Sequence, residues 1–150
     1  MKHLDWPSFE EWEERRCWFE NKNEEFMGEG MVGYSVSEQA CALIAEVQSV
    51  FCAGAWIAVI ILVVSVIDAQ LRETETPDFM GSTKELIKIV AHNDSRLQRL
   101  RKRRNSLVHV NIENPAITVD EQWEDRKKLE KDASEAIELM FEAFFSNPWI

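Results

Sequence analysis

The sequence contains little glycine, proline, tyrosine or cysteine, and these low counts narrow the possible structures. Its 150 residues include 5 Gly and 4 Pro, too few for a sandwich or barrel with many tight turns. The 3 cysteines form no C-x-x-C pair, which excludes a complete disulfide framework and disfavours a zinc site. This cysteine content fits a reducing compartment, so we expect a cytoplasmic protein.

The common signatures of phosphate and metal chemistry are also missing from the sequence. It has no glycine-rich Walker or Rossmann loop, no H-E-x-x-H pair and no cluster of cysteine and histidine. We therefore expect no cofactor and no metal. A secretory signal is not expected in residues 1–33, where nine acids outnumber four bases and no apolar stretch follows the start.

Charge is unevenly distributed along this acidic chain. The formal net charge is −10, yet residues 84–104 hold eight bases against two acids, a local net charge of +6. Such a stretch suits local binding of a polyanion, and it also suits a solvated helix face paired with acidic segments. Charge alone favours the second interpretation. With 45% apolar and 29% charged residues, the composition is that of a globular domain.

The periodicity of apolar residues predicts an all-α bundle of four to five helices. The apolar segment 53–67 is fifteen residues long, too short to span a bilayer, and is better explained as part of a buried central helix over about 55–74. Its many Ile and Val residues also suit a buried strand, but no partner strand is evident. Gly54 is expected to bend or interrupt the chain before it. Two further helices are predicted over 83–107 and 120–145.

Serine residues mark the expected starts of two more helices. Ser8–Glu11 and Ser35–Glu38 both have the spacing of a capping box. The helix after Ser8 is acidic and aromatic, and we expect it to pack on the main body through a face that contains Phe9, Trp12, Arg16 and Phe19. The alternative is an arm that binds a partner. We therefore divide the chain into an N-terminal extension, residues 1–33, and a helical domain, residues 34–150.

Two polar residues interrupt the apolar stripe of the helix predicted over 83–107. The spacing through Leu97 and Leu100 predicts an apolar residue at position 104, where the chain has Arg104, and Asn93 breaks the stripe earlier. Burying a guanidinium is costly unless it is paired or faces a cleft, so such a residue fits a functional site. The alternative is an arginine that extends past the core to water.

The spacing of Arg104 and His109 constrains any shared site. On an ideal helix these residues are about 140° away from a common face, whereas Asn105 and His109 share one. Arg104 and His109 would therefore meet only if the helix breaks between them or if a second chain supplies part of the site. A two-fold dimer would bring two copies of this helix end together.

The segment Arg104–His109, R-N-S-L-V-H, resembles the R-x4–6-H signature of HEPN domains (higher eukaryotes and prokaryotes nucleotide-binding). The context is similar over about residues 35–146: an Ala-rich helix leads through Gly54 into a long apolar helix that ends in Asp68, a basic helix carries the motif, and an amphipathic helix follows. This order resembles prokaryotic HEPN proteins that stand alone or accompany toxin and phage-defence systems.

The resemblance implies a HEPN-like homodimer with the motif at the dimer cleft and the activity of a metal-independent endoribonuclease. His109 would be the general acid or base at the ribose 2′-OH or the leaving oxygen. Arg104 would stabilise charge on the scissile phosphate, and Asn105 would orient His109 or the phosphate. Histidine and arginine suffice because RNA carries its own nucleophile, and the product would be a 2′,3′-cyclic phosphate.

Other residues have supporting roles in this hypothesis. Asp68 would hold Arg104 by an ion pair, or would simply be a charge at the polar end of its helix. The candidates for phosphate contacts are Arg96, Arg99, Arg101, Lys102 and Arg103. The expected partners are RNA, a second copy of the chain, and an antitoxin or defence-system protein, with no membrane. Some toxin members have a modified tyrosine two positions after the histidine, where this chain has Asn111.

A second hypothesis is a non-catalytic HEPN-like module that dimerises or that binds RNA or a partner protein, since some family members do only this. A membrane-associated helical protein is the third and least favoured hypothesis. The negative net charge of −10 favours a selective RNA substrate, because it would confine non-specific binding of RNA to the basic stretch.

Overall fold

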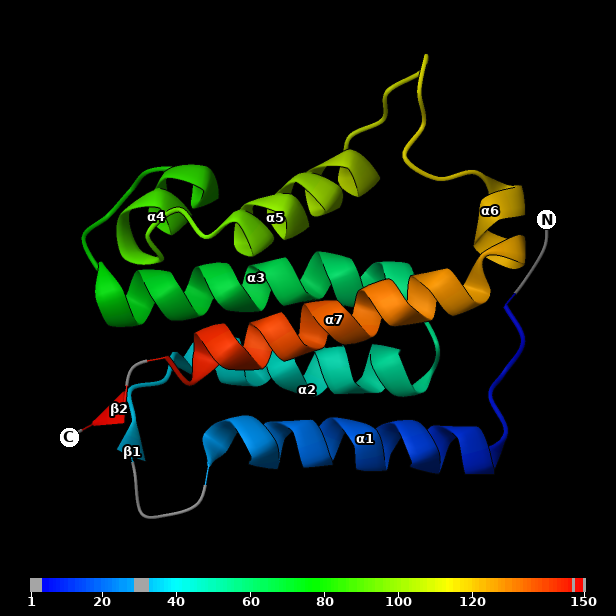
Figure 1. Cartoon of the computed structure of the whole chain (residues 1–150), viewed down its shortest axis with the longest axis horizontal. Helices are drawn as coiled ribbons and strands as arrows, with labels where there is room; N and C mark the ends of the chain where they lie inside the picture. Colours follow the sequence, from blue (N-terminus) through cyan, green and yellow to red (C-terminus); the bar gives the residue numbers. More distant parts are fainter. Residues whose placement is uncertain (1–3, 29–32, 147, 150) are drawn as a thin grey trace.

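The computed structural model describes residues 4–28, 33–146 and 148–149, and these form an all-helical bundle (Figure 1). This confirms the all-α prediction. The helices are α1 (Phe9–Met27), α2 (Glu38–Cys52), α3 (Trp56–Glu75), α4 (Thr83–Val90), α5 (Ser95–Val108), α6 (Val119–Glu124) and α7 (Arg126–Phe144). The two-residue strands β1 (Gly33–Tyr34) and β2 (Pro148–Trp149) pair antiparallel.

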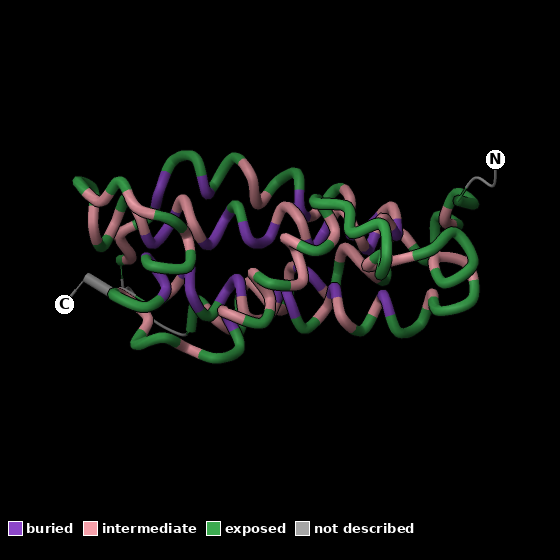
Figure 2. Tube along the Cα trace, turned by 90° about the horizontal axis from the view of Figure 1, so that it is seen from above, coloured by how far each residue is buried: buried purple, intermediate pink, exposed green. Residues whose placement is uncertain are grey.

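Helix α3 is the centre of the bundle, as its apolar sequence predicts. It packs along α2 on one side and α7 on another, while α4 and α5 cover it from the opposite side (Figure 1). Figure 2 shows buried positions gathered toward the interior of the molecule. The segment 53–67 thus contributes to a core helix, and within the described residues no helix is both long and apolar enough to cross a membrane.

The N-terminal helix α1 packs on the main body, as expected, but only part of the predicted face is buried. Ser8 and Glu11 form the predicted capping box, in which the Glu11 amide donates to Ser8 Oγ over 3.1 Å. Phe19 is buried against Phe141 at 5.2 Å between ring centroids, whereas Phe9 is exposed and Arg16 pairs with surface glutamates. The N-terminal extension therefore shares the hydrophobic core of the helical domain.

Gly54 separates α2 from α3, as its position predicts. Its φ is +73°, a left-handed conformation that glycine adopts without strain, and a Cβ there would lie 3.1 Å from Arg15 Nη1. Arg15 donates to the Cys52 carbonyl over 3.1 Å, and Arg126 donates to the Gly54 carbonyl. Both guanidinium groups lie over the Trp56 ring. Burial and the charge of Arg15 lower the pKa of Arg126.

The prediction of one continuous helix over 83–107 is wrong. The chain forms α4 and α5, separated by a turn in which His92 and Asn93 have φ of +47° and +58°. Asn tolerates the left-handed conformation, and Asp94 then caps α5 by accepting hydrogen bonds from the Arg96 and Leu97 amides. Asn93 therefore lies in a turn and does not break a helical stripe.

Two other helix boundaries also differ from the prediction. The helix expected over 120–145 is divided at Asp125 into α6 and α7, and Thr118 and Glu121 form a capping box before α6. Ser37, not Ser35, caps α2 by accepting a hydrogen bond from the Ala40 amide. The prediction was four to five helices. Because of the breaks before α5 and before α7, the described chain has seven.

Buried Gln70 joins three segments of the fold. Its Oε1 accepts a hydrogen bond from the Ser37 amide over 2.9 Å, and its Nε2 donates to the carbonyls of Ser35 and Phe144 over 2.8 and 3.2 Å. The side chain is thus fully bonded inside an apolar core. It links α3 to the start of α2 and the end of α7.

Candidate active site

The motif Arg104–His109 occupies the last turn of α5. The helix continues without a break to Val108, and His109 is its C-cap, where the backbone amide donates to the Asn105 carbonyl over 3.0 Å. No break therefore brings Arg104 and His109 onto one face within a protomer. Arg104 lines a cleft, whereas His109 is exposed and is not part of the lining of that cleft.

The cleft beside Arg104 has a volume of about 470 Å³ and lies between α3, α5 and the loop before α4. Asp68, Arg72 and Glu73 supply its charges together with Arg104, and Gln39 and Thr83 add polar groups. Arg104 Nε is buried and has no hydrogen-bond partner among the described residues. The polar residue that breaks the apolar stripe therefore lines a cleft and has a buried N–H donor that makes no hydrogen bond within the described chain.

Asp68 lies in the cleft but does not pair with Arg104 in the described structure. Its carboxylate accepts two hydrogen bonds from Arg72, over 2.9 Å from Nη2 and 3.2 Å from Nε. This pairing raises the pKa of Arg72. Arg72 also donates to the Phe79 carbonyl over 2.8 Å, so it ties α3 to the loop before α4. Of the two alternatives left open for Asp68, the ion pair with Arg104 is not formed, and Asp68 pairs within α3.

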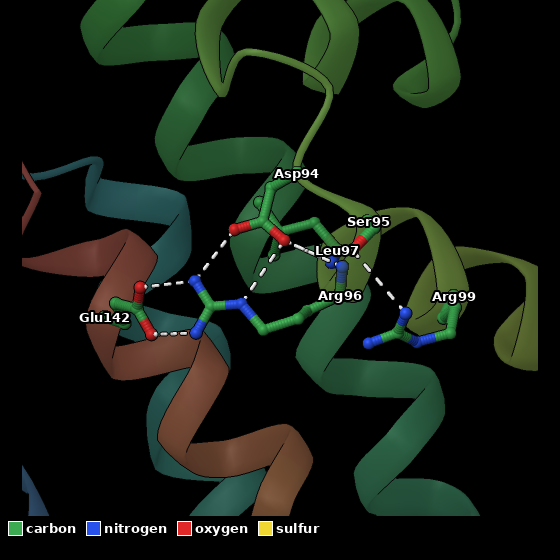
Figure 3. A network of polar contacts seen from close by, with 6 residues as sticks. All are labelled: Asp94, Ser95, Arg96, Leu97, Arg99 and Glu142. Atoms are coloured by element: carbon green, nitrogen blue, oxygen red, sulfur yellow. Dashed lines mark hydrogen bonds and ion pairs between the residues drawn. The ribbon is translucent and has the colours of Figure 1, made fainter.

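Arg96, the first of the predicted phosphate contacts, is engaged by two carboxylates (Figure 3). Its Nη2 lies 2.8 Å from Asp94 Oδ2 and 2.7 Å from Glu142 Oε1. The hydrogen bond from the Arg96 guanidinium is the main cause that lowers the pKa of Asp94. Two carboxylates compensate the charge of Arg96, which joins α5 to α7 and is a poor candidate for binding phosphate.

The other four predicted phosphate contacts point in two directions. Arg99 and Arg103 line a groove between α5 and α7, and Arg103 also donates to the Ala116 carbonyl over 3.1 Å. Arg101 donates to Gln98 Oε1 over 3.0 Å, and Lys102 is exposed. Neither Arg101 nor Lys102 belongs to the lining of that groove. These two side chains are the ones available for RNA outside it.

An exposed apolar segment that follows the motif was not identified from the sequence. Val108, Val110 and Ile112 alternate with polar residues, and they are 43%, 84% and 91% exposed. The loop projects from the bundle between α5 and α6 (Figure 1). Alternation of apolar and polar residues was the available signal, and neighbouring exposed apolar side chains are a feature of many interaction surfaces.

Nothing in the described part of the chain forms a metal centre. No group of three or more His, Cys, Asp or Glu side chains there is arranged to hold a metal ion, and Cys17, Cys41 and Cys52 are free thiols. Burial is the main cause that raises the pKa of both Cys41 and Cys52, which disfavours reactive thiolates.

A comparison of the chain with models of known protein families, with curated proteins and with solved structures finds no match.

Proposed function

We propose that this chain is a metal-independent endoribonuclease of a toxin or phage-defence type, with Arg104 and His109 at its active site. The observation that carries the proposal is the buried, unpartnered Nε of Arg104 at a polar cleft. Because this N–H makes no hydrogen bond in the described chain, a guanidinium that turns toward a phosphate oxygen would lose none at Nε. The HEPN-like motif supplies the second residue, His109, whose exposed side chain is accessible to a large substrate.

The proposed reaction uses the nucleophile that RNA itself carries. One His109 removes the proton of the ribose 2′-OH while the 2′ oxygen forms a bond to phosphorus. The bond from phosphorus to the 5′ oxygen breaks, and the imidazole of this His109, now protonated, returns a proton to that oxygen. Arg104 stabilises the negative charge that accumulates on the phosphate oxygens. Asn105, on the His109 face of α5, orients the imidazole or the phosphate. The products are a 2′,3′-cyclic phosphate and a 5′-hydroxyl.

The proposed active site needs two copies of the chain. Within one protomer Arg104 and His109 lie on different faces of α5, so an Arg104 of one protomer would act with the His109 of its partner. The exposed Val110 and Ile112 directly follow His109 and supply an apolar surface for this contact. A homodimer whose interface is this loop would bury these side chains. It would also bring the motifs of the two protomers together.

Aspartate substitutions in the loop are expected to prevent dimerisation. Ile112→Asp and Val110→Asp place a charge where the proposed interface is apolar, so sedimentation equilibrium should report monomers at concentrations where the parent dimerises. Met80→Asp is the matched control because Met80 is 92% exposed, as Ile112 is 91% exposed, but lies in another loop. A parent that stays monomeric, or a control that dissociates equally, would contradict the dimer.

The direct test of the activity is RNA cleavage by the purified chain in excess EDTA. We expect cleavage to continue under chelation, because histidine and arginine supply the chemistry, and we expect cyclic phosphate ends on the products. Analysis of the product ends by mass spectrometry distinguishes this route from metal-dependent hydrolysis. Cleavage that stops with EDTA, or 5′-phosphate products, would refute the proposed mechanism.

Selective cleavage is part of the proposal. Arg96 is paired with carboxylates, and Arg99 and Arg103 lie opposite acidic residues. Few basic residues are therefore left for non-specific binding of RNA. A tRNA or another structured loop is therefore favoured as substrate over bulk RNA. We further propose that the enzyme acts in the cytoplasm, where its free thiols stay reduced, and that an antitoxin or defence-system protein controls it.

The alternative function is a non-catalytic module that dimerises or that binds RNA or a partner protein. The observation in its favour is the separation of Arg104 from His109 within one chain. Phe19 is no longer a candidate contact for a partner because it belongs to the core. Exposed Trp6 and Phe9, beside the acids of α1, would take its place. Loss of a complex on Trp6→Ala, with no RNA cleavage by the parent, would favour this alternative.

A further inference from the structure

A groove between α5 and α7 combines an apolar floor with walls of opposite charge. Its volume is about 540 Å³, and Ile60, Leu100, Ala136 and Leu139 form the floor. One wall carries Arg96, Arg99 and Arg103, which recur at the spacing of a single helix face. The other wall is acidic, with Asp132, Glu135, Glu138 and Glu142 along α7.

The groove is closed at one end and open along its length. The Arg96–Glu142 ion pair bridges the two walls near the start of α5 (Figure 3). Helix α5 packs more closely on α3 than on α7, and it rises away from the bundle toward its C-terminal end (Figure 1). From Arg96 to Arg103 the helix rises about 10 Å, the length of two helical turns.

Glu138 pairs with Lys22 of α1 over 2.9 Å, but four other charged side chains of the open groove have no strong ion pair within the described chain. Arg99 makes one 3.5 Å contact with Ser95 Oγ, and Arg103 bonds the Ala116 carbonyl, but neither forms an ion pair with a described carboxylate. Opposite them, Asp132 has no ion pair among the described residues, and Glu135 has only a 3.7 Å contact with exposed Lys131. Two unlike charged walls thus face each other across apolar side chains.

This charge pattern disfavours RNA and favours a peptide. A phosphate chain in the groove would be attracted by the arginine wall but repelled by the acidic wall. A helix with apolar residues along one side, acids on one flank and bases on the other would match the floor and both walls. We propose that the groove between α5 and α7 binds such an amphipathic helix of a partner protein.

The test uses three fluorescent helical peptides with the same leucine face. The mixed peptide has glutamates on one flank and lysines on the other, and the two controls have only glutamates or only lysines on both flanks. Fluorescence anisotropy with the full chain should show the mixed peptide binding at least about tenfold more tightly than either control. Equal or weaker binding of the mixed peptide would overturn the proposal.

Charge-reversed variants locate the binding. Arg99→Glu and Glu135→Lys each place a repulsive charge opposite one flank of the peptide. Each variant should therefore bind the mixed peptide at least about fivefold more weakly than the parent does. Lys102→Glu is the matched control, since it reverses an exposed charge of α5 outside the groove lining, and should leave the affinity unchanged. An equal loss in all three variants would show that the effect is not specific to the groove lining and would refute the groove. Displacement of the bound peptide by an RNA oligonucleotide, with RNA binding lost in Arg99→Glu, would make the groove a nucleic-acid site instead.

Discussion

His109→Ala and Arg104→Ala are each expected to lower the rate of RNA cleavage by about 100-fold or more. The first removes the group that we propose as the proton carrier. The second removes the donor that we propose for the developing charge on phosphate. Arg104→Lys should recover little of the loss because an ammonium cannot reproduce the planar guanidinium with its Nε–H. Initial rates on a defined RNA in EDTA measure the effect.

Two surface residues give matched controls for these variants. His92 is also exposed and lies in the turn before α5, and Lys131 is an exposed base on α7 that is not among the predicted RNA contacts. His92→Ala and Lys131→Ala should reduce cleavage by less than about threefold, since neither residue has a role in the proposed site. Circular dichroism establishes that all variants are folded. Parent-like rates for His109→Ala would remove it from the mechanism.

Gln70→Leu should lower the free energy of unfolding by about 3 kcal/mol, although leucine is the more apolar residue. The substitution leaves the Ser37 amide and the Ser35 and Phe144 carbonyls without the hydrogen bonds that Gln70 provides. Leucine has a similar volume, so the loss arises from these polar groups and not from a cavity. Urea unfolding followed by tryptophan fluorescence measures it.

The control for Gln70→Leu is Gln39→Leu on α2. Gln39 is exposed, so this substitution should change stability by less than about 0.5 kcal/mol. A stability for Gln70→Leu at or above that of the parent would show that water or backbone adjustments replace the lost hydrogen bonds. It would also show that the three segments do not depend on this side chain for their association.

The parts of the fold that depend on local pattern could be predicted from the sequence. The central helix follows from the length and apolar character of 56–67, and the break before it follows from Gly54. The capping box at Ser8 needs only residues three positions apart. Each of these features is decided within one or two helical turns, so single-sequence patterns contain the necessary information.

The remaining features depend on contacts between distant segments or on small local preferences. The two helix breaks, at His92–Asn93 and at Asp125, lie within patterns that stay amphipathic on both sides, so periodicity does not reveal them. The role of Gln70 arises from backbone groups 33 to 74 residues away. The pairing of Arg96 with Glu142 spans 46 residues and engages a residue that the sequence offers as a phosphate contact.

The candidate site was partly predictable for the same reason. Position 104 could be singled out because an arginine stood where the helix expects an apolar residue, and it does line a cleft. The role of Asp68 was not decided by pattern, because an ion pair with Arg104 and a charge at the polar end of its helix were both left open. Asp68 and Arg72 are four residues apart on one helix, a spacing that brings their side chains together without tertiary contacts.

The central claim is that Arg104 of one protomer acts with His109 of its partner, and subunit complementation tests it most directly. Each variant, Arg104→Ala or His109→Ala, is expected to have almost no activity alone. The two chains are then mixed in equal amounts, dissociated and allowed to reassociate. Half of the dimers then contain one chain of each kind, and each of these has one intact site. The account predicts recovery of about a quarter of the parent activity. No recovery from a mixture shown to contain heterodimers would contradict the shared site.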